Sequence, residues 1–178
     1  MPSPRERREA QVDAMNADPF GNLYNSRLEA GIRAVVVLEC LRPGTADLSE
    51  MVLFDHVVVH TADVGGPPSL HAKVPARKGE LLVRRRLVEA GLELMQRCHL
   101  VERQGTELGL EWRASEEAAS YVALLEEGYS THLRTCAEWV GHQVRAMTKD
   151  RFRAFARAEL GDWAETFGPH AGPRGRLD

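Results

Sequence analysis

The sequence lacks most of the features by which a function is usually recognised. It has three cysteines, Cys40, Cys98 and Cys136, which lie far apart and form no CxxC pair. An odd number of scattered cysteines does not suit a disulfide framework or a cysteine-based zinc site, so we expect reduced thiols in a cytoplasmic protein. Cys40 and Cys98 have apolar neighbours and are expected to pack as small hydrophobic residues.

Long apolar runs and an excess of positive charge are missing as well. The longest apolar run, Ala34 to Leu38, is far too short to cross a bilayer, and the charged N-terminus has no apolar core like that of a signal peptide. We therefore expect no membrane role. The 23 Lys and Arg residues are balanced by 26 Asp and Glu, which gives a net charge of −3. Any nucleic-acid contact must then come from a local patch.

None of the common phosphate-binding or hydrolytic motifs is complete. Gly65 and Gly66 lead into two prolines and not into a helix with Lys and Ser or Thr, so they do not form a phosphate loop. Ser69 has Asp63 and His71 near it in sequence, but no GxSxG elbow surrounds it. We predict no catalytic residue, no cofactor and no enzymatic activity.

Two histidines have a spacing that could suit a metal ion. His56 and His60 are four residues apart and could share one face of a helix, but HExxH is absent and no cysteine lies nearby. We predict no metal site. Instead, Asp55 or Asp63 is expected to accept hydrogen bonds from backbone or arginine groups, and His60 or His71 to bridge the following loop to the helix.

The hydrophobic periodicity predicts a mainly α chain with a small β-hairpin wing. Strands are expected at about 100–104 and 109–114. Helices are expected from Arg27 until Pro43-Gly44, from Leu48 to about Ala62, from about Gly79 to Cys98, from Ser115 to about Tyr129, from Thr131 to Met147, and from Arg151 to Phe167. We interpret residues 1–19 as a flexible tail, 20–147 as a winged-helix-like domain, and 148–178 as a C-terminal helical extension with a disordered tail.

The helix before the hairpin is the element that would read DNA in such a domain. At 100° per residue its polar side carries charges of both signs, namely Arg85, Arg86, Glu89, Glu93 and Arg97, and its apolar side includes Val83 and Cys98. Carboxylates that face outward repel phosphates, and the wing tip holds a glutamate and no Lys or Arg. This side is predicted to suit a protein partner better than DNA.

One cationic stretch supports the alternative, a winged-helix transcription regulator. Seven basic or histidine side chains lie within sixteen residues, against the single acid Glu80. They are His71, Lys73, Arg77, Lys78, Arg84, Arg85 and Arg86. The same residues could instead form a solvated loop and a helix start whose cations pair with acids elsewhere.

Four stretches together resemble a known family. They are Asn25–Arg33, Asp55 with Val58–His71, Arg77–Arg85, and Gly109–Ser115. The sequence over roughly residues 20 to 145 is similar to the middle components, of the second type, of bacterial ABC-three-component systems. The stretch through Gly65-Gly66-Pro67-Pro68 is the more specific part of the resemblance, and the helix and wing alone are less specific.

The resemblance implies a non-enzymatic adaptor that couples an SMC/Rad50-like ABC ATPase to an effector in anti-phage or anti-plasmid defence. It transfers no catalytic residues. We expect partner or nucleic-acid contacts at two surfaces, the Asp63–His71 loop and the basic helix start. The residues are Asp63, His71, Lys73, Arg77, Lys78, Arg84, Arg85 and Arg86. Two further contacts stay open: DNA through the assembled complex, and a second copy of the chain.

Overall fold

The computed structural model describes residues 26–71, 80–107, 109–126 and 128–160. The expected tail at 1–19, and the part of the expected C-terminal extension that follows residue 160, lie outside the described residues. Within these ranges the elements are α2 (Arg27–Leu41), β1 (Ala46–Asp47), α3 (Leu48–Val59), the 3-10 helix η1 (Thr61–Val64), α4 (Glu80–Arg97), β2 (Val101–Thr106), β3 (Gly109–Ala114), α5 (Glu116–Ala123) and α6 (Gly128–Leu160). The three strands pair antiparallel in the order β1-β3-β2. The prediction of a mainly α fold with a small hairpin wing is confirmed.

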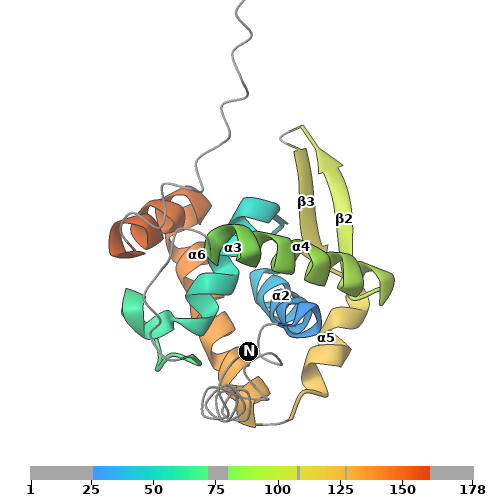
Figure 1. Cartoon of the computed structure of the whole chain (residues 1–178), viewed down its shortest axis with the longest axis horizontal. Coiled ribbons are helices and arrows are strands. Elements are labelled where there is room, and N and C mark those ends of the chain that lie inside the picture. Colours follow the sequence, from blue (N-terminus) through green and yellow to red (C-terminus); the bar gives the residue numbers. More distant parts are fainter. Residues whose placement is uncertain (1–25, 72–79, 108, 127, 161–178) are drawn as a thin grey trace, which may run out of the picture.

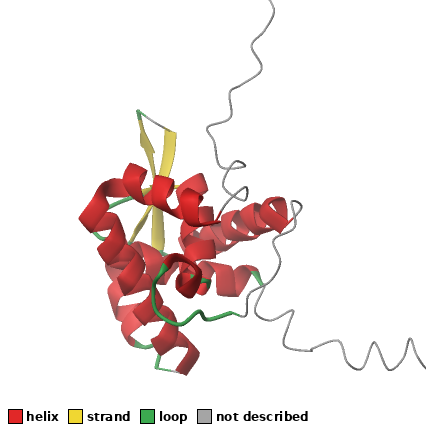
Figure 2. Cartoon of the chain, turned by 90° about the vertical axis from the view of Figure 1, so that its left-hand side faces the viewer, coloured by secondary structure: helices red, strands yellow, loops and turns green. Residues whose placement is uncertain are grey.

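Helix α2 is the centre of the molecule and contacts α3, α4, α5, α6 and β3. Figure 1 shows α4 crossing in front of it, α3 and α6 on one side, α5 on the other, and the β2–β3 hairpin projecting from the helical body. Because partners surround α2, its apolar run Val35–Leu38 is fully buried. The view of Figure 2 shows the hairpin extending beyond the helices.

Two glycines allow α2 and α4 to cross closely. A Cβ atom on Gly91 would lie 2.6 Å from the backbone nitrogen of Gly31 and 3.0 Å from the carbonyl oxygen of Arg27. A Cβ atom on Gly31 would in turn meet Gly91 O at 2.9 Å. The helix backbones therefore touch at this crossing, where no larger side chain fits.

Side-chain caps explain where two helices begin. The Ser26 side chain accepts a hydrogen bond from Glu29 N at 3.2 Å, and Asp47 forms a capping box with Glu50 at the start of α3. Ser115 occupies the N-cap position of α5, but its hydroxyl donates to the His99 carbonyl at 2.7 Å and makes no cap bond. Ser26, Asp47 and Ser115 directly precede the first residues of α2, α3 and α5.

Several boundaries differ from the prediction. Helix α3 ends at Val59, because residues 61–64 continue as 3-10 helix η1. The helix expected over Ser115–Tyr129 ends at Ala123, and α6 begins at Gly128. Helix α6 contains a non-helical residue, Thr148 (φ 59°, ψ 157°), which separates the two C-terminal segments expected from the sequence. Strand β1 was not predicted, since two residues leave no alternating pattern.

Two residues assigned to the buried side of α4 lie in solvent. Val83 is 67% exposed, because α4 packs through Val88, Leu92 and Met95, on the opposite side of the helix. Cys98 is exposed because α4 ends at Arg97, so the residue belongs to the following turn. The expectation that Cys98 packs as a hydrophobic residue was wrong, although all three cysteines are free thiols. No helix in the described part of the chain has both the length and the apolar character to cross a membrane.

Candidate interaction surfaces

The segment from Asp63 to His71 is held against α6 by backbone and side-chain contacts. Gly65 has a left-handed backbone (φ 78°), which glycine adopts without a steric penalty, and the chain then turns back toward Thr61. The Thr61 hydroxyl donates to Pro67 O at 2.9 Å, and His132 Nε2 of α6 lies 2.8 Å from Pro68 O. The Gly-Gly-Pro-Pro motif therefore shapes a loop that is fixed at several points. Within it, Asp63 lies half-buried on η1.

His71 links the end of this loop to two helices. Its backbone N–H donates to Val59 O at 3.1 Å, and its ring stacks on Tyr129 of α6 with the centroids 6.4 Å apart. The ring also lies edge-on to His60, 6.2 Å away. Burial and nearby arginines lower the pKa of His71 to about 4, so the side chain is neutral at pH 7.

A buried cluster of charges joins α2, α3 and α4. Asp55 accepts from Arg33 Nε at 2.6 Å and from Arg84 Nη1 at 2.7 Å, and the Asp55 side chain is only 3% exposed. Burial raises the pKa of Asp55, but the two guanidinium groups outweigh it, and the pKa lies below its usual value. Of the expected alternatives, Asp55 or Asp63 with backbone or arginine donors, the structure shows Asp55 accepting from two arginines.

Glu29 extends this cluster to α6. It lies 2.9 Å from Arg33 and accepts a hydrogen bond from the Tyr129 hydroxyl at 2.7 Å. Burial is the main reason that the pKa of Glu29 is raised, and the Tyr129 and Arg33 contacts oppose it. Sequence reasoning missed Arg33 and Tyr129. The one available signal was an arginine within the apolar run of α2, where a charge needs a buried partner.

The two histidines with metal-like spacing are close together; His60 is buried and His56 is half-buried. The rings of His56 and His60 lie 4.7 Å apart, and burial and the Arg84 charge lower the pKa of His56 to about 3. The described residues hold no group of three or more His, Cys, Asp or Glu side chains that could bind a metal ion. The pair is packed inside the same polar cluster as Asp55 and His71.

The basic stretch is only partly available as a surface. Lys73, Arg77 and Lys78 lie outside the described residues. Arg84 points inward to Asp55, with its side chain only 13% exposed. Arg85 and Arg86 are exposed, and Arg85 Nη1 donates to the Ser49 hydroxyl at 3.3 Å. In the described part of the stretch, two cations face solvent.

Both acids of α4 also face solvent. Glu89 and Glu93 are exposed beside Arg86 and Arg97. Among the described residues, none of these four side chains forms an ion pair within 4.0 Å. The outward side of α4 is therefore a surface of mixed, unpaired charge.

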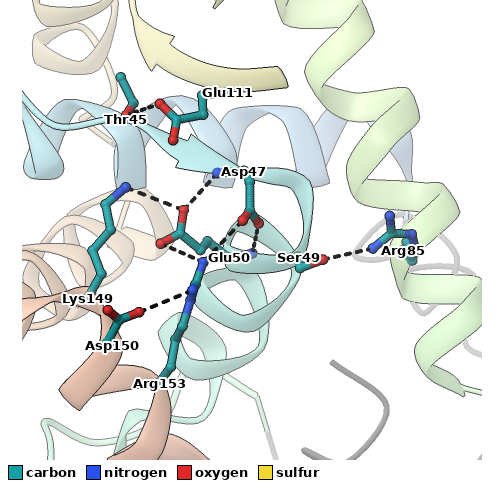
Figure 3. A network of polar contacts seen from close by, with 9 residues as sticks. All are labelled: Thr45, Asp47, Ser49, Glu50, Arg85, Glu111, Lys149, Asp150 and Arg153. Atoms are coloured by element: carbon teal, nitrogen blue, oxygen red, sulfur yellow. Dashed lines mark hydrogen bonds and ion pairs between the residues drawn. The ribbon is translucent and has the colours of Figure 1, made fainter. Parts of the chain in front are cut away.

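A second polar network fixes the last part of α6 to the start of α3 (Figure 3). Glu50 is buried and lies 3.0 Å from Arg153 and 3.4 Å from Lys149, while Arg153 also lies 3.1 Å from Asp47. Phe152 packs on Phe54 with the ring centroids 5.8 Å apart. Sequence reasoning did not find this docking.

Together, the fold and these surfaces define a mainly α domain whose buried polar groups connect its helices and whose charged faces point outward. The family model of the ABC-three component (ABC-3C) system Middle Component 2 matches residues 23–166. The chain belongs to this family, as its resemblance predicted, and the match includes the part of α6 that follows Thr148. Neither a curated protein nor a solved structure gave a match.

Proposed function

We propose that the chain is a non-enzymatic adaptor in the bacterial cytoplasm. It couples an SMC/Rad50-like ABC ATPase to an effector in an anti-phage or anti-plasmid defence complex. Membership of the middle-component family supports a role between other components. The observation that carries the choice of protein partners is the outward side of α4, where Glu89 and Glu93 stand among the arginines.

The arrangement of elements supports a winged-helix domain adapted to protein contacts. Three helices, α2, α3 and α4, are followed by the β2–β3 hairpin, which makes α4 the counterpart of a DNA-recognition helix. In DNA-binding helix-turn-helix proteins the preceding helix crosses the phosphate backbone. Here the start of α3 carries Asp47 and Glu50 and is covered by Arg153. Arg153 and Lys149 already pair with these carboxylates and cover this part of α3, so a phosphate contact here is disfavoured.

The polar groups that could suggest catalysis have structural contacts. The Ser69 hydroxyl accepts a hydrogen bond from Ala62 N at 3.1 Å, and Asp55 is shared between two arginines. A carboxylate held by two guanidinium groups is a poor base, because they stabilise its ionised form. These contacts support a non-catalytic role.

We place the partner contacts at the Asp63–His71 segment and at the start of α4 with Arg85 and Arg86. Arg84 is excluded, because it is buried against Asp55. Ala62, which is exposed beside Asp63, provides a probe, and the exposed Ala119 on α5 provides a matched control.

The test is co-expression with the ABC ATPase that this proposal places in the same gene cluster. We expect the wild-type chain to co-purify with the ATPase, A62R to lose most of this binding, and A119R to keep it. A wild-type chain that stays alone would contradict the adaptor function. Equal binding by A62R and A119R would contradict the placement of the contact.

The DNA-binding alternative rests on Arg85 and Arg86. It predicts that the isolated chain binds duplex DNA, that binding weakens steeply with salt, and that R85A/R86A abolishes it. Absence of a mobility shift at low salt would eliminate this alternative.

A further inference from the structure

We propose that the outward face of α4 binds the same face of a second copy of the chain, with the two α4 helices antiparallel and a two-fold axis near Ala90. This inference adds a second copy of the chain to the proposed adaptor and assigns Arg86, at the start of α4, to the contact between copies; an ATPase contact at the Asp63–His71 segment does not depend on it.

The face is a single line of residues along the helix. Val83, Arg86, Ala90, Glu93 and Arg97 follow each other at steps of three, four, three and four residues, so they lie on one side of α4. Ala90 is half-buried and the other four are exposed. The α4 helix lies at the front of the domain in Figure 1, and the described elements packed against it, α2, α3 and β2, do not cover this line.

The charges on this line have no partner among the described residues. Arg86 and Glu93 are two turns apart, about 10 Å along the axis, so they cannot pair with each other. Glu93 and Arg97 are separated by one turn but form no ion pair within 4.0 Å. These side chains are free to pair with an approaching surface.

The order of the residues is self-complementary only for antiparallel helices. Arg86 stands four residues before Ala90 and Glu93 three after it, so a two-fold axis at Ala90 brings Arg86 of each copy to Glu93 of the other. Two identical ion pairs result, as the symmetry of such a dimer requires. The small side chain at the axis permits close approach. Parallel helices would bring like charges together.

Val83 and Arg97 form a further contact between the two copies of the proposed dimer. They lie seven residues on either side of Ala90, so the same axis brings Val83 of one copy to Arg97 of the other. The aliphatic part of an arginine can cover an apolar side chain while its guanidinium stays in water. This contact covers a valine that is 67% exposed in the single chain.

A single pair of helices buries less area than the roughly 1,600 Å² of a standard interface. The dimer is therefore expected to be in concentration-dependent exchange with the monomer, and to weaken with salt, since its specific contacts are exposed ion pairs. Sedimentation velocity of the full-length chain across a concentration series, at low and high salt, measures both properties.

Charge reversal gives the decisive test. We expect R86E and E93R each to raise the dimer dissociation constant roughly tenfold or more, and R86E/E93R to restore dimerisation, because it exchanges the partners. E138R, which reverses an exposed charge on α6, serves as the control and should leave the dimer unchanged. In a C98S background, A90C should form a disulfide between copies.

Other outcomes would overturn the proposal. A wild-type chain that is monomeric at every concentration excludes the dimer. A dimer that R86E and E93R leave intact uses a different surface. If the wild-type chain is monomeric and E93R loses binding to the ATPase, the outward face of α4 binds the ATPase and not a second copy. The dimer proposal then fails, while the co-purification of the wild-type chain with the ATPase still supports the adaptor function.

Discussion

At the scale of residues, the interior of this protein contains more charge than its composition suggests. Arg33 is 1% exposed and Asp55 is 3% exposed, and they are joined by a hydrogen bond between α2 and α3. The sequence predicted that Asp55 or Asp63 would accept hydrogen bonds from backbone or arginine groups. It could not indicate which arginine, because Arg33 and Arg84 are 22 and 29 residues away and only the packing of three helices brings them together.

Removing the charge of Asp55 should strongly destabilise the folded protein. In D55N, Arg33 and Arg84 keep their charges but lose the shared carboxylate, and breaking a buried pair in this way costs about 3–5 kcal/mol. We expect a loss of at least about 3 kcal/mol in the free energy of unfolding, measured by urea denaturation followed by tryptophan fluorescence.

The surface pair between Glu102 and Arg113 provides the control for D55N. Both side chains are about half exposed, so E102Q should lower the free energy of unfolding by less than about 1 kcal/mol. Similar small losses in D55N and E102Q would show that the buried cluster contributes no more than an exposed pair.

At the scale of elements, local signals predicted the helices and hairpin better than the contacts between them. Caps at Ser26 and Asp47 and the periodicity of α4 depend on neighbouring residues, which the sequence displays directly. The outward position of Glu89 and Glu93 followed from the same periodicity. Strand β1 pairs with β3, and Arg153 contacts the start of α3. Both contacts join residues that are far apart in the chain, so no local sequence pattern predicts them.

The crossing of α2 and α4 should not tolerate a methyl group. G91A gains helix propensity of about 1 kcal/mol, but its Cβ would lie 2.6 Å from Gly31 N, which forces the helices apart. Overpacking of this kind costs about 1–3 kcal/mol or more, and because the atom displaced is backbone, we expect a net loss of about 2 kcal/mol in thermal or urea unfolding.

Gly105 in the hairpin is the matched control for the crossing. A Cβ atom there would meet nothing within 4 Å, so G105A should change the free energy of unfolding by no more than about 0.5 kcal/mol. If G91A proved as stable as G105A, the two helices would have room to separate without loss.

At the scale of the whole molecule, two half-buried histidines, His56 and His71, link stability to pH. The pKa values of His56 and His71 are lowered to about 3 and about 4, from 6.5 in the unfolded chain. The unfolded chain therefore takes up protons that the folded chain does not, and stability is greatest above pH 6.5. We expect a loss of about 1 kcal/mol per histidine between pH 6.5 and 5.5.

Urea unfolding at several pH values measures how the free energy of unfolding changes with pH. H56N should remove about half of the loss in unfolding free energy between pH 6.5 and 5.5. H142N, at an exposed position on α6, should leave this loss unchanged. The lowered pKa of Asp55 contributes only at more acidic pH, below its unfolded value of 3.8. Stability that stays constant from pH 6.5 to 5.5 would be inconsistent with lowered pKa values for His56 and His71.

The docking of Arg153 on the start of α3 has a consequence for how the molecule is made. Arg153 and Asp47 are 106 residues apart, so a nascent chain exposes the acidic start of α3 long before the ribosome has added its basic partner. Domains fold from the N-terminal side during synthesis. This contact therefore forms only after translation has passed Arg153, when the preceding part of the domain has already been synthesised.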